Sequence, residues 1–420
     1  MAADQAAVRR NNLSLVMRHL QTCGPSSRAA IAGRTGIAKA TVSSLVTELV
    51  RRGVVRDIGV LDTGRQGRPA SLVELDGRYV VTIGAELNVD FLAVVVADLS
   101  ARVVFERRVP VETASTDHGF LLGQLVRLLA EAIAAAAPAR VAAATVAVSG
   151  VVDPTTGVVR FAPNLGWHDL PISEHLARKL RPSFPITVEN DANMGAFAEY
   201  RLGGHADASS LAYVVGAQGV GGGVVVDGSL LRGRRGLGGE VGHMVLVRDG
   251  LACRCGGRGC WETLIGLGQV LHATMAEEAD ELLHDYSIGP EAKVAAIVQR
   301  LADGDDHVPH ALAEIGAWLG VGLANLTKLV DPDVIVLGGY FRALAPWLLP
   351  AALAVLDGKG IDEGPNGARV VLSRLGFSAA SLGGAIFASE QVFNNPSALA
   401  HRTLHATEID QRMQIATGAS

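Results

Sequence analysis

The stretch 239-GEVGHMVLVRDGLACRCGGRGCWE-262 holds three of the four cysteines of this 420-residue chain within eight residues. A histidine lies ten residues before the first of these cysteines. Together they make a Cys3His set, which is the composition of a closed tetrahedral structural zinc site. A redox role is the alternative, but the thiols lack the C-x-x-C spacing of thioredoxin-like sites. The sequence therefore predicts one structural zinc ion per chain, with these ligands: His243, Cys253, Cys255 and Cys260.

Composition agrees with a metal role for these thiols. The chain is 49% hydrophobic and 19% charged, and its length is enough for two or three domains. Its N-terminus carries Asp4 and lacks an apolar run of signal-peptide length, and no later apolar stretch is long and uninterrupted enough to predict a membrane span. We therefore expect a cytoplasmic protein, and in that reducing compartment clustered cysteines favour metal binding over disulfides.

Charge is distributed unevenly along the chain. The first 75 residues contain 11 Lys and Arg against 5 Asp and Glu, and the remainder contains 26 against 37. A head of net charge +6 on a body of net charge -11 is typical of a protein in which one small domain binds a polyanion. The head is therefore the segment in which to search for a nucleic-acid-binding motif.

The head has the pattern of three short helices followed by a hairpin. Apolar residues recur with helical spacing from Leu13 to Leu20, and Ser26 or Ser27 is expected to cap a second helix that ends near Gly36. A third helix, within 38-AKATVSSLVTELVRRG-53, has one apolar face. Its outward polar residues are the candidates for contacts with DNA bases: Lys39, Thr41, Ser44 and Thr47. Two helices joined by a tight turn are the arrangement that places the second helix in the major groove.

After the third helix, two short extended segments flank a glycine-rich tip that carries Arg65 and Arg68. This tip is typical of a wing whose arginines contact the phosphate backbone or a narrow minor groove. A helical trio with a hairpin can instead mediate protein contacts, and arginines on a turn are often only solvated. The positive charge, the polar helix face and the tip together favour binding to a double-stranded DNA operator.

From Val80 onward, apolar strands alternate with helices. The segment 80–109 predicts a meander of strands, a helix follows over about 118–137, and VAAATVAVSG is another buried strand. A second series of this kind begins at LAYVVGAQGVGGGVVVDGSLL, and a late helix and strand end on a glycine pair. These patterns predict two α/β lobes with a cleft between them.

Three motifs carry a resemblance to a known family. NDAN at 190–193, GVGGGVVVDGSLLRGRRGLGGEVGH at 219–243 and CRCGGRGCWE at 253–262 resemble the ROK family of sugar kinases and sugar-responsive repressors. The family's repressor branch carries a winged helix-turn-helix in front of an actin-like pair of α/β lobes. The resemblance implies a DNA-binding domain over 1–76 and a sugar-binding domain over 77–395. Within the latter, we expect a lobe boundary near 195 and a C-terminal helix that returns to the first lobe; 396–420 is expected to form a loose tail.

The resemblance also implies which residues hold a sugar: Asn190, Asp191, Glu240, His243 and Glu262. Such a mixture suits a polyol, because carboxylates accept hydrogen bonds from vicinal hydroxyls while Asn and His can donate or accept. A zinc ion on one imidazole nitrogen would fix the ring so that the other nitrogen faces a hydroxyl. Asn164, in the sequence PNLGW, is a further candidate contact, although a turn residue is the alternative there.

Kinase activity is expected to be lost. Asp191 matches the family's general base, but a carboxylate at that position also suits a pure sugar binder. ROK kinases carry D-x-G-x-T in the first phosphate loop, where this chain has Thr82 and Glu86 in place of the acid and the hydroxyl. The threonine of the second phosphate loop, G-T-G-x-G-G-G, is replaced by Gln218. A charged glutamate about 5 Å from phosphate would cost on the order of 3 kcal/mol at an effective dielectric constant of about 20.

These observations predict a sugar-responsive transcription regulator, a repressor that leaves its operator when a sugar or sugar derivative closes the cleft. We expect a homo-oligomer, a dimer or tetramer, because winged-helix repressors bind half-sites in pairs. A sugar kinase with a fused DNA-binding domain is the first alternative. A zinc-sensing regulator is the second, disfavoured because the cysteines lie far from the head in the sequence.

Overall fold

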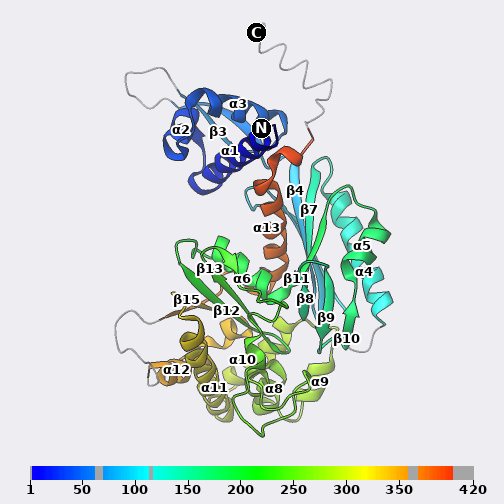
Figure 1. Cartoon of the computed structure of the whole chain (residues 1–420). Coiled ribbons are helices and arrows are strands. Elements are labelled where there is room, and N and C mark those ends of the chain that lie inside the picture. Colours follow the sequence, from blue (N-terminus) through cyan, green and yellow to red (C-terminus); the bar gives the residue numbers. More distant parts are fainter. Residues whose placement is uncertain (1, 62–69, 113–116, 358–367, 401–420) are drawn as a thin grey trace.

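The computed structural model describes residues 2–61, 70–112, 117–357 and 368–400, which form a small N-terminal unit and two α/β lobes (Figure 1). Ser27 caps the second helix of the N-terminal unit, its hydroxyl accepting from the Ala30 amide at 3.1 Å, and Gly36 ends that helix with a φ of 72°. These boundaries are the ones that the sequence predicts. The elements of the N-terminal unit are α1 (Ala2–Cys23), β1 (Ser26–Ser27), α2 (Arg28–Thr35), α3 (Lys39–Arg51), β2 (Val55–Leu61) and β3 (Ala70–Leu75).

The strands of the N-terminal unit form one small sheet in the order β1-β3-β2, on which the helices pack. The predicted hairpin is present as the antiparallel pair β2 and β3. Its tip, with Arg65 and Arg68, lies outside the described residues.

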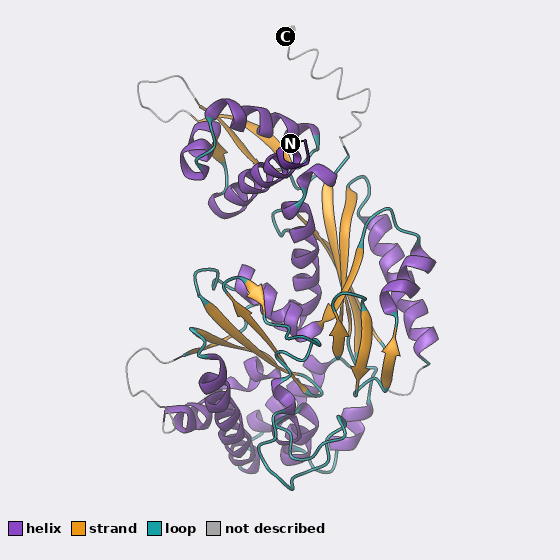
Figure 2. Ribbon diagram, viewed as in Figure 1, coloured by secondary structure: helices purple, strands orange, loops and turns teal. Residues whose placement is uncertain are grey.

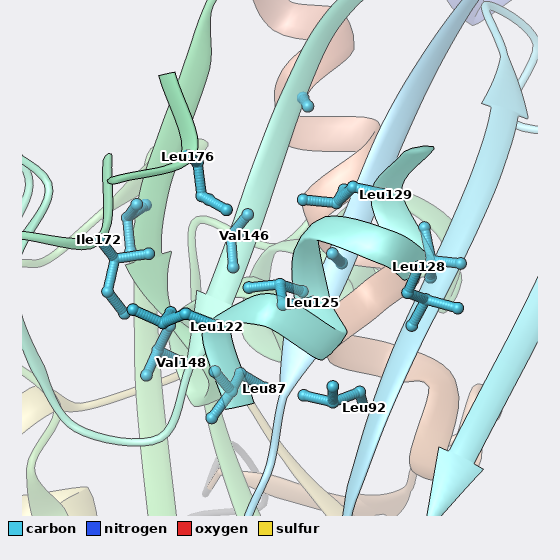
Figure 3. Close-up of a cluster of buried hydrophobic side chains, with 14 of the residues drawn as sticks. Leu87, Leu92, Leu122, Leu125, Leu128, Leu129, Val146, Val148, Ile172 and Leu176 are labelled. Atoms are coloured by element: carbon cyan, nitrogen blue, oxygen red, sulfur yellow. The ribbon is translucent and has the colours of Figure 1, made fainter. Parts of the chain in front are cut away.

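The first lobe is built on a five-stranded sheet in the order β11-β7-β4-β5-β6. Strands β4 and β5 are buried along their whole length and are mostly apolar, although β4 also buries Thr82 and Glu86. The helix α4 covers the outer face of the sheet with a leucine stripe (Figure 3). The strands are β4 (Val80–Leu87), β5 (Phe91–Asp98), β6 (Val103–Pro110), β7 (Arg140–Val148) and β11 (Ile186–Asn190), and the outer helices are α4 (His118–Ala135) and α5 (Ile172–Leu180).

A three-stranded sheet extends this lobe beside the end of β11. It consists of β8 (Val151–Asp153), β9 (Val158–Ala162) and β10 (Trp167–Leu170).

The second lobe repeats the design of the first. Its sheet has the order β14-β13-β12-β15-β16, in which an antiparallel meander is extended by two parallel strands, as in the first lobe. The turn 88–90 joins β4 to β5, and the turn 217–219 occupies the equivalent position between β12 and β13. The strands are β12 (Ser210–Gly216), β13 (Val220–Val226), β14 (Ser229–Leu230), β15 (Val334–Gly339) and β16 (Arg369–Leu372).

Helices cover the second sheet on both faces (Figure 2). One face carries α6 (Asp191–Leu202), and the other is packed by a helical layer with Trp261 at its centre. The remaining helices are α7 (Glu262–Ile265), α8 (Leu267–Thr274), α9 (Ala279–His284), α10 (Pro290–Ala302), α11 (His307–Val330) and α12 (Tyr340–Asp357), with 3-10 turns η1 (Val241–His243) and η2 (Gly376–Ser378).

The two lobes meet through one helix from each sheet. The last helix, α13 (Ala379–Asn394), lies on the first sheet and packs directly on α6. Gly383 makes this approach possible, because a Cβ there would lie 2.0 Å from the Met194 carbonyl oxygen. Gly84 of β4 meets α13 equally closely, since its Cβ would lie 1.8 Å from the Ser381 carbonyl oxygen. The helix α13 is thus held by backbone contact against both lobes.

The upper end of α13 enters the core of the N-terminal unit (Figure 1). Val392, Phe393 and Leu399 join the same buried cluster as the apolar faces of α1 and α3. Residues 396–400, which the sequence analysis assigns to the tail, include the 3-10 turn η3 (Pro396–Ala398), and 401–420 lie outside the described residues. The N-terminal unit therefore shares a continuous core with the lobes.

Two helices, α4 and α12, are long and apolar enough to cross a membrane by length and composition alone, although the sequence analysis expected no such stretch. A third of the residues in each window, 33%, are buried within the protein. The leucines of α4 pack on the first sheet, and α12 packs on α11. One-sided burial of this kind is also typical of core helices in globular proteins.

Candidate functional site

The structure brings the predicted metal ligands together. The ligand atoms of His243, Cys253, Cys255 and Cys260 all lie within 4.8 Å of one another. Cys255 Sγ lies 3.7 Å from Cys260 Sγ, and Cys253 Sγ lies 3.6 Å from His243 Nδ1. A tetrahedral zinc ion with Zn–S bonds of about 2.3 Å and a Zn–N bond of about 2.0 Å places two sulfurs about 3.8 Å apart and sulfur and nitrogen about 3.5 Å apart. The donor set and its spacing therefore fit zinc.

The loop around the cluster depends on a glycine. Gly259 has a φ of 68°, and a Cβ there would lie 1.6 Å from the Val247 carbonyl oxygen. Burial raises the pKa of both Cys253 and Cys260, so these thiols alone resist ionisation. A divalent cation would reverse this preference because it stabilises the thiolates. The cluster thus has the chemistry of a site that needs a metal to hold its ligands in the charged form.

Next to the cluster lies a cleft of about 280 Å³ between the lobes. The candidate sugar ligands all line it, and they come from both lobes and from the metal loop. We call this group the sugar side of the cleft: Asn164, Asn190, Asp191, Glu240, His243 and Glu262. The turns 88–90 and 217–219, together with Glu86, form what we call the turn side.

Asn190 and Asp191 lie where β11 passes into α6. Asn190 caps the helix, its Oδ1 accepting from the Asn193 amide at 2.9 Å while its Nδ2 donates to the Gly150 carbonyl at 3.0 Å. Most of its hydrogen-bonding capacity therefore serves the fold. Asp191 accepts hydrogen bonds from the Ala192 amide and from the hydroxyl of Ser149, and burial raises its pKa.

Two glutamates flank the imidazole of His243. Nε2 lies 3.8 Å from Glu240 Oε2, whereas Nδ1, on the side of the cysteines, lies 3.6 Å from Glu262 Oε1. A metal on Nδ1 would leave Nε2 facing the cleft beside Glu240. Burial, together with the nearby carboxylates of Asp191 and Glu262, raises the pKa of Glu240 to about 7.

Asn164 and Glu262 meet at the turn 217–219. Glu262 Oε2 accepts from the Val220 amide at 3.4 Å. A Cβ on Gly219 would lie 2.5 Å from Glu262 Oε2 and 3.2 Å from Asn164 Nδ2, so glycine leaves the space that both side chains use. Asn164 thereby lies against the cleft, where a contact with a ligand is sterically open.

On the turn side, Thr82 and Glu86 are both buried. The hydroxyl of Thr82 donates to the Ala385 carbonyl of α13 at 2.8 Å, so it serves helix packing. Glu86 Oε1 accepts from Asn88 at 3.0 Å, and its Oε2 has no partner among the described residues. Burial and the charge of Asp191 raise the pKa of Glu86 to about 8. This burial disfavours the charged form of Glu86 and so weakens the repulsion of phosphate that the sequence analysis expected from a charged carboxylate.

The sequence analysis missed a buried ion pair that joins the turn 88–90 to α10, and a hydrogen bond that joins this turn to the turn 217–219. Lys293 Nζ of α10, fully buried, lies 3.3 Å from Asp90 Oδ1, and Gln218 Nε2 donates to the same oxygen at 3.1 Å. Asp90 belongs to the first lobe, and both of its partners belong to the second. One signal was present: Lys293 falls on the apolar stripe of α10 with Val294 and Ile297. Ser149, directly after β7, was missed as well.

The predicted recognition helix is α3. Val42, Leu45, Val46 and Leu49 are buried, as expected. The candidate base contacts lie exposed on the other face: Lys39, Thr41, Ser44 and Thr47. Thr47 donates its hydroxyl proton to the Ser43 carbonyl at 2.9 Å, so toward a base edge it would act as an acceptor. Arg51, at the end of the same helix, is also exposed and was not predicted.

The lobes and the cleft are those of the sugar-kinase-like class, and the N-terminal unit adds a helix-turn-helix region. The chain belongs to the ROK family: the model of that family matches residues 82–391, and the IclR helix-turn-helix domain model matches residues 13–58.

Similar proteins include both regulators and kinases. A putative xylose repressor of Caldicellulosiruptor sp. is 29% identical over 386 residues, covering 90% of this chain and 96% of the relative. The crystal structure of a ROK family transcriptional regulator, described as a homologue of the E. coli MLC protein, superposes with a TM-score of 0.76 at 23% identity, covering 92% of this chain and 97% of the other. A ROK hexokinase from Thermus thermophilus superposes with a TM-score of 0.57 at 31% identity, covering 74% and 99%.

Proposed function

We propose that this protein is a sugar-responsive DNA-binding transcription regulator, and more specifically a repressor released from its operator when a sugar occupies the cleft. The observation that carries the proposal is a cleft lined by all six candidate sugar ligands in a chain whose N-terminal unit exposes a polar recognition helix. In this proposal, residues 1–76 bind DNA, residues 77–395 bind the sugar, and the protein acts in the cytoplasm as a dimer or tetramer. Similarity to xylose repressors along nearly the whole chain supports it.

The effector is proposed to be an uncharged sugar. Asp191, Glu240 and Glu262 converge on the cleft, and their mutual repulsion contributes to the raised pKa of Glu240. Among the described residues that line the cleft, none is Lys or Arg, and Arg254 lines a neighbouring depression. A phosphate ester would place further negative charge among these carboxylates, whereas neutral hydroxyls would donate to them.

One structural zinc ion per chain is proposed to complete the sugar side. His243, Cys253, Cys255 and Cys260 would hold it, and the ion would supply a fixed position for the His243 ring. The opposite ring nitrogen, Nε2, then stays oriented toward Glu240 and the ligand. This makes the metal a support for sugar binding rather than a sensed signal.

We also propose that phosphoryl transfer has been lost, although Asp191 keeps the position of the family's general base. Support comes from the turn side, where Asp90, Gln218 and Lys293 tie the two turns together across the lobes. By resemblance, the family's first phosphate motif matches residues 82–86, just before the turn 88–90, and its second matches residues 217–223, which include the turn 217–219. An additional support is Thr82, which replaces the acid of the first loop and is engaged by α13.

The test is operator release measured against D-xylose and D-glucose and their phosphate esters, with ATP turnover assayed under the same conditions. Release by a free sugar without ATP consumption supports the proposal. Sugar-dependent ATP consumption would favour the kinase alternative, and release by a phosphate ester alone would contradict the uncharged effector. Operator binding that follows zinc concentration at constant sugar would favour the zinc-sensing alternative.

The DNA-binding assignment has a separate test. Ser44→Ala is expected to weaken or relax sequence-specific binding by about 1 to 3 kcal/mol if its hydroxyl contacts a base. Arg65→Ala and Arg68→Ala should weaken binding to all sequences and lower its salt dependence by about one unit of slope each. An Arg65/Arg68 double variant with unchanged operator binding would remove the wing from the proposal.

A further inference from the structure

A single carboxylate lies between arginines from two different parts of the molecule. Glu390 of α13 accepts a hydrogen bond from Arg18 Nη2 of α1 at 2.6 Å and from Arg201 Nη2 of α6 at 3.0 Å. The Glu390 side chain is only 14% exposed, and each arginine is about a third exposed or less. Glu390 is therefore a partner both of the N-terminal unit, the proposed DNA-binding unit, and of the second lobe.

The helix α6 connects this carboxylate to the cleft. Asn190 and Asp191, at its start, line the cleft, and Arg201 is its second-last residue. Its twelve residues span about 18 Å at 1.5 Å per residue. All the residues from Ala192 to Tyr200 are buried, so α6 is held as a rigid rod within the protein. A displacement of Asp191 would therefore move Arg201 by nearly the same amount.

The geometry of the two central helices determines what such a displacement would do. The helix α6 packs on the second sheet and α13 on the first, and at Gly383 the two helices are at backbone distance. Where a ligand changes the angle between the lobes, α6 and α13 move with the sheets on which they pack, and the contact at Gly383 has no flexible side chain to absorb the motion. The shift changes the position of Arg201 relative to Glu390.

At the other end, Glu390 is tied to the DNA-binding unit. Arg18 also donates to Asn394 Oδ1 at 2.8 Å, and its guanidinium lies 5.7 Å from the centre of the Phe393 ring. Phe393 is part of the core of the DNA-binding unit. The position of α1 relative to α13 thus depends in part on how Glu390 divides its hydrogen bonds between Arg18 and Arg201.

We propose that Glu390 is a positioning residue that transmits occupancy of the cleft to the DNA-binding unit. When a ligand binds, Arg201 moves and its ion pair with Glu390 changes. The ion pair between Glu390 and Arg18 then changes as well, and this reorients α1 and the recognition helix α3. The proposal rests on the proposed function, since it describes how the sugar signal reaches DNA. It requires that the two arrangements differ in their affinity for the sugar.

The experiment compares the wild type with Glu390→Gln and Arg201→Gln. For each, operator affinity is measured with and without D-xylose or D-glucose, whichever binds the wild type more tightly, and sugar affinity is measured by calorimetry. We expect sugar affinity within about twofold of wild type, while the sugar-dependent ratio of operator affinities falls by roughly three- to tenfold in both variants. Arg201→Gln keeps the Arg18–Glu390 contact, so it tests transmission even where Glu390→Gln disturbs docking of the DNA-binding unit.

The matched control is Arg140→Gln. Arg140 of β7 also reaches the segment next to the DNA-binding unit, donating to the Ala400 carbonyl at 3.3 Å, but it contacts neither Glu390 nor Arg201 in the described structure. Its loss should leave the sugar-dependent ratio unchanged. An unchanged ratio in both Glu390→Gln and Arg201→Gln would overturn the proposal, as would an equal fall in Arg140→Gln.

Amide hydrogen exchange separates this proposal from the proposed function. In the wild type, sugar is expected to alter exchange in α1 as well as around the cleft, whereas in Glu390→Gln only the cleft should respond. If that pattern is found but sugar leaves operator affinity unchanged, the transmission stands and the repressor function fails. If sugar alters operator affinity with the same α1 exchange in the wild type and in Glu390→Gln, the function stands and the transmission fails.

Discussion

The two sides of the cleft differ in what holds them together. On the sugar side, polar side chains from both lobes and from the metal loop face open space, with Glu240, Asp191 and Glu262 close enough to repel one another. On the turn side, Asp90 is paired across the lobes: it accepts hydrogen bonds from Lys293 and Gln218 of the opposite lobe. Groups left facing a cavity are available to a ligand, whereas groups paired across the lobes are committed to the fold.

The proposed function assigns ligand binding to the sugar side, whereas the turn side, where kinases of this fold would bind phosphate, is assigned a structural role. The sugar side keeps Asp191, Glu240 and Glu262 close together at the cleft although their repulsion is unfavourable without a ligand. The turn side instead buries the charge of Asp90 against Lys293, which agrees with the proposed loss of phosphoryl transfer. The contrast predicts that substitutions on the sugar side should change ligand response more than stability, and that substitutions on the turn side should do the reverse.

The largest expected effect is loss of the metal. Cys255→Ser should abolish the binding of about one zinc per chain and with it the sugar response, because structural zinc sites contribute about 10 kcal/mol or more of apparent binding free energy. Zinc content by mass spectrometry and sugar binding by calorimetry check this. Cys23→Ser, at an exposed thiol outside the cluster, is the control and should change neither. Native protein purified without metal that keeps its sugar response would contradict the zinc assignment.

The next largest effect is expected on the turn side. Lys293→Met leaves Asp90 buried without its cationic partner, and breaking a buried pair in this way typically costs about 3 to 5 kcal/mol of unfolding free energy. Chemical denaturation measures it, and Lys328→Met, at an exposed lysine of α11, is the control. The double variant Asp90→Asn/Lys293→Met should recover part of the loss. A stability equal to wild type in Lys293→Met would mean that the two sides do not differ as described.

On the sugar side, Glu240→Ala should lower sugar affinity by tenfold or more, since a hydrogen bond to a charged group typically contributes about 1.5 to 3 kcal/mol. Operator affinity without sugar and the unfolding free energy should stay close to those of wild type. Titration of operator release with sugar provides the measurement. A variant that responds to sugar as the wild type does would exclude Glu240 from the site.

The sequence indicated the metal cluster far better than the contacts of the turn side. Cys253, Cys255 and Cys260 lie within eight residues, and their chemistry is visible in local spacing. The helix α3 could be predicted equally well, because the helical spacing of its apolar residues is visible within one short segment of sequence. Asp90 and Lys293 are 203 residues apart, and only the packing of the two lobes brings them together. For the same reason, no pattern in the sequence indicates that Arg18, Arg201 and Glu390 meet.

Glu86 provides the smallest effect and the sharpest test of the turn side, because its predicted role changed most. The sequence suggested a charged group that repels phosphate, whereas burial raises its pKa from 4.5 to about 8.

In the folded protein the carboxyl of Glu86 is then mostly neutral at pH 6 to 7, while in the unfolded chain it is ionised. Unfolding releases a proton in this range, so the stability that Glu86 contributes is fully present below about pH 4.5 and is lost as pH rises toward 8. The expected slope is about 1.4 kcal/mol per pH unit. Glu240, whose pKa is raised to about 7, adds a slope of the same sign, so the informative quantity is the difference from wild type. Glutamine cannot ionise, so Glu86→Gln should lower the slope by about 1.4 kcal/mol per pH unit when unfolding free energies are compared at pH 6 and pH 7, and Glu174→Gln, at an exposed glutamate of α5, should leave it unchanged. If the slope in Glu86→Gln equals that of wild type, the carboxylate is charged in the folded protein, and repulsion of phosphate again becomes a sufficient reason for the loss of phosphoryl transfer.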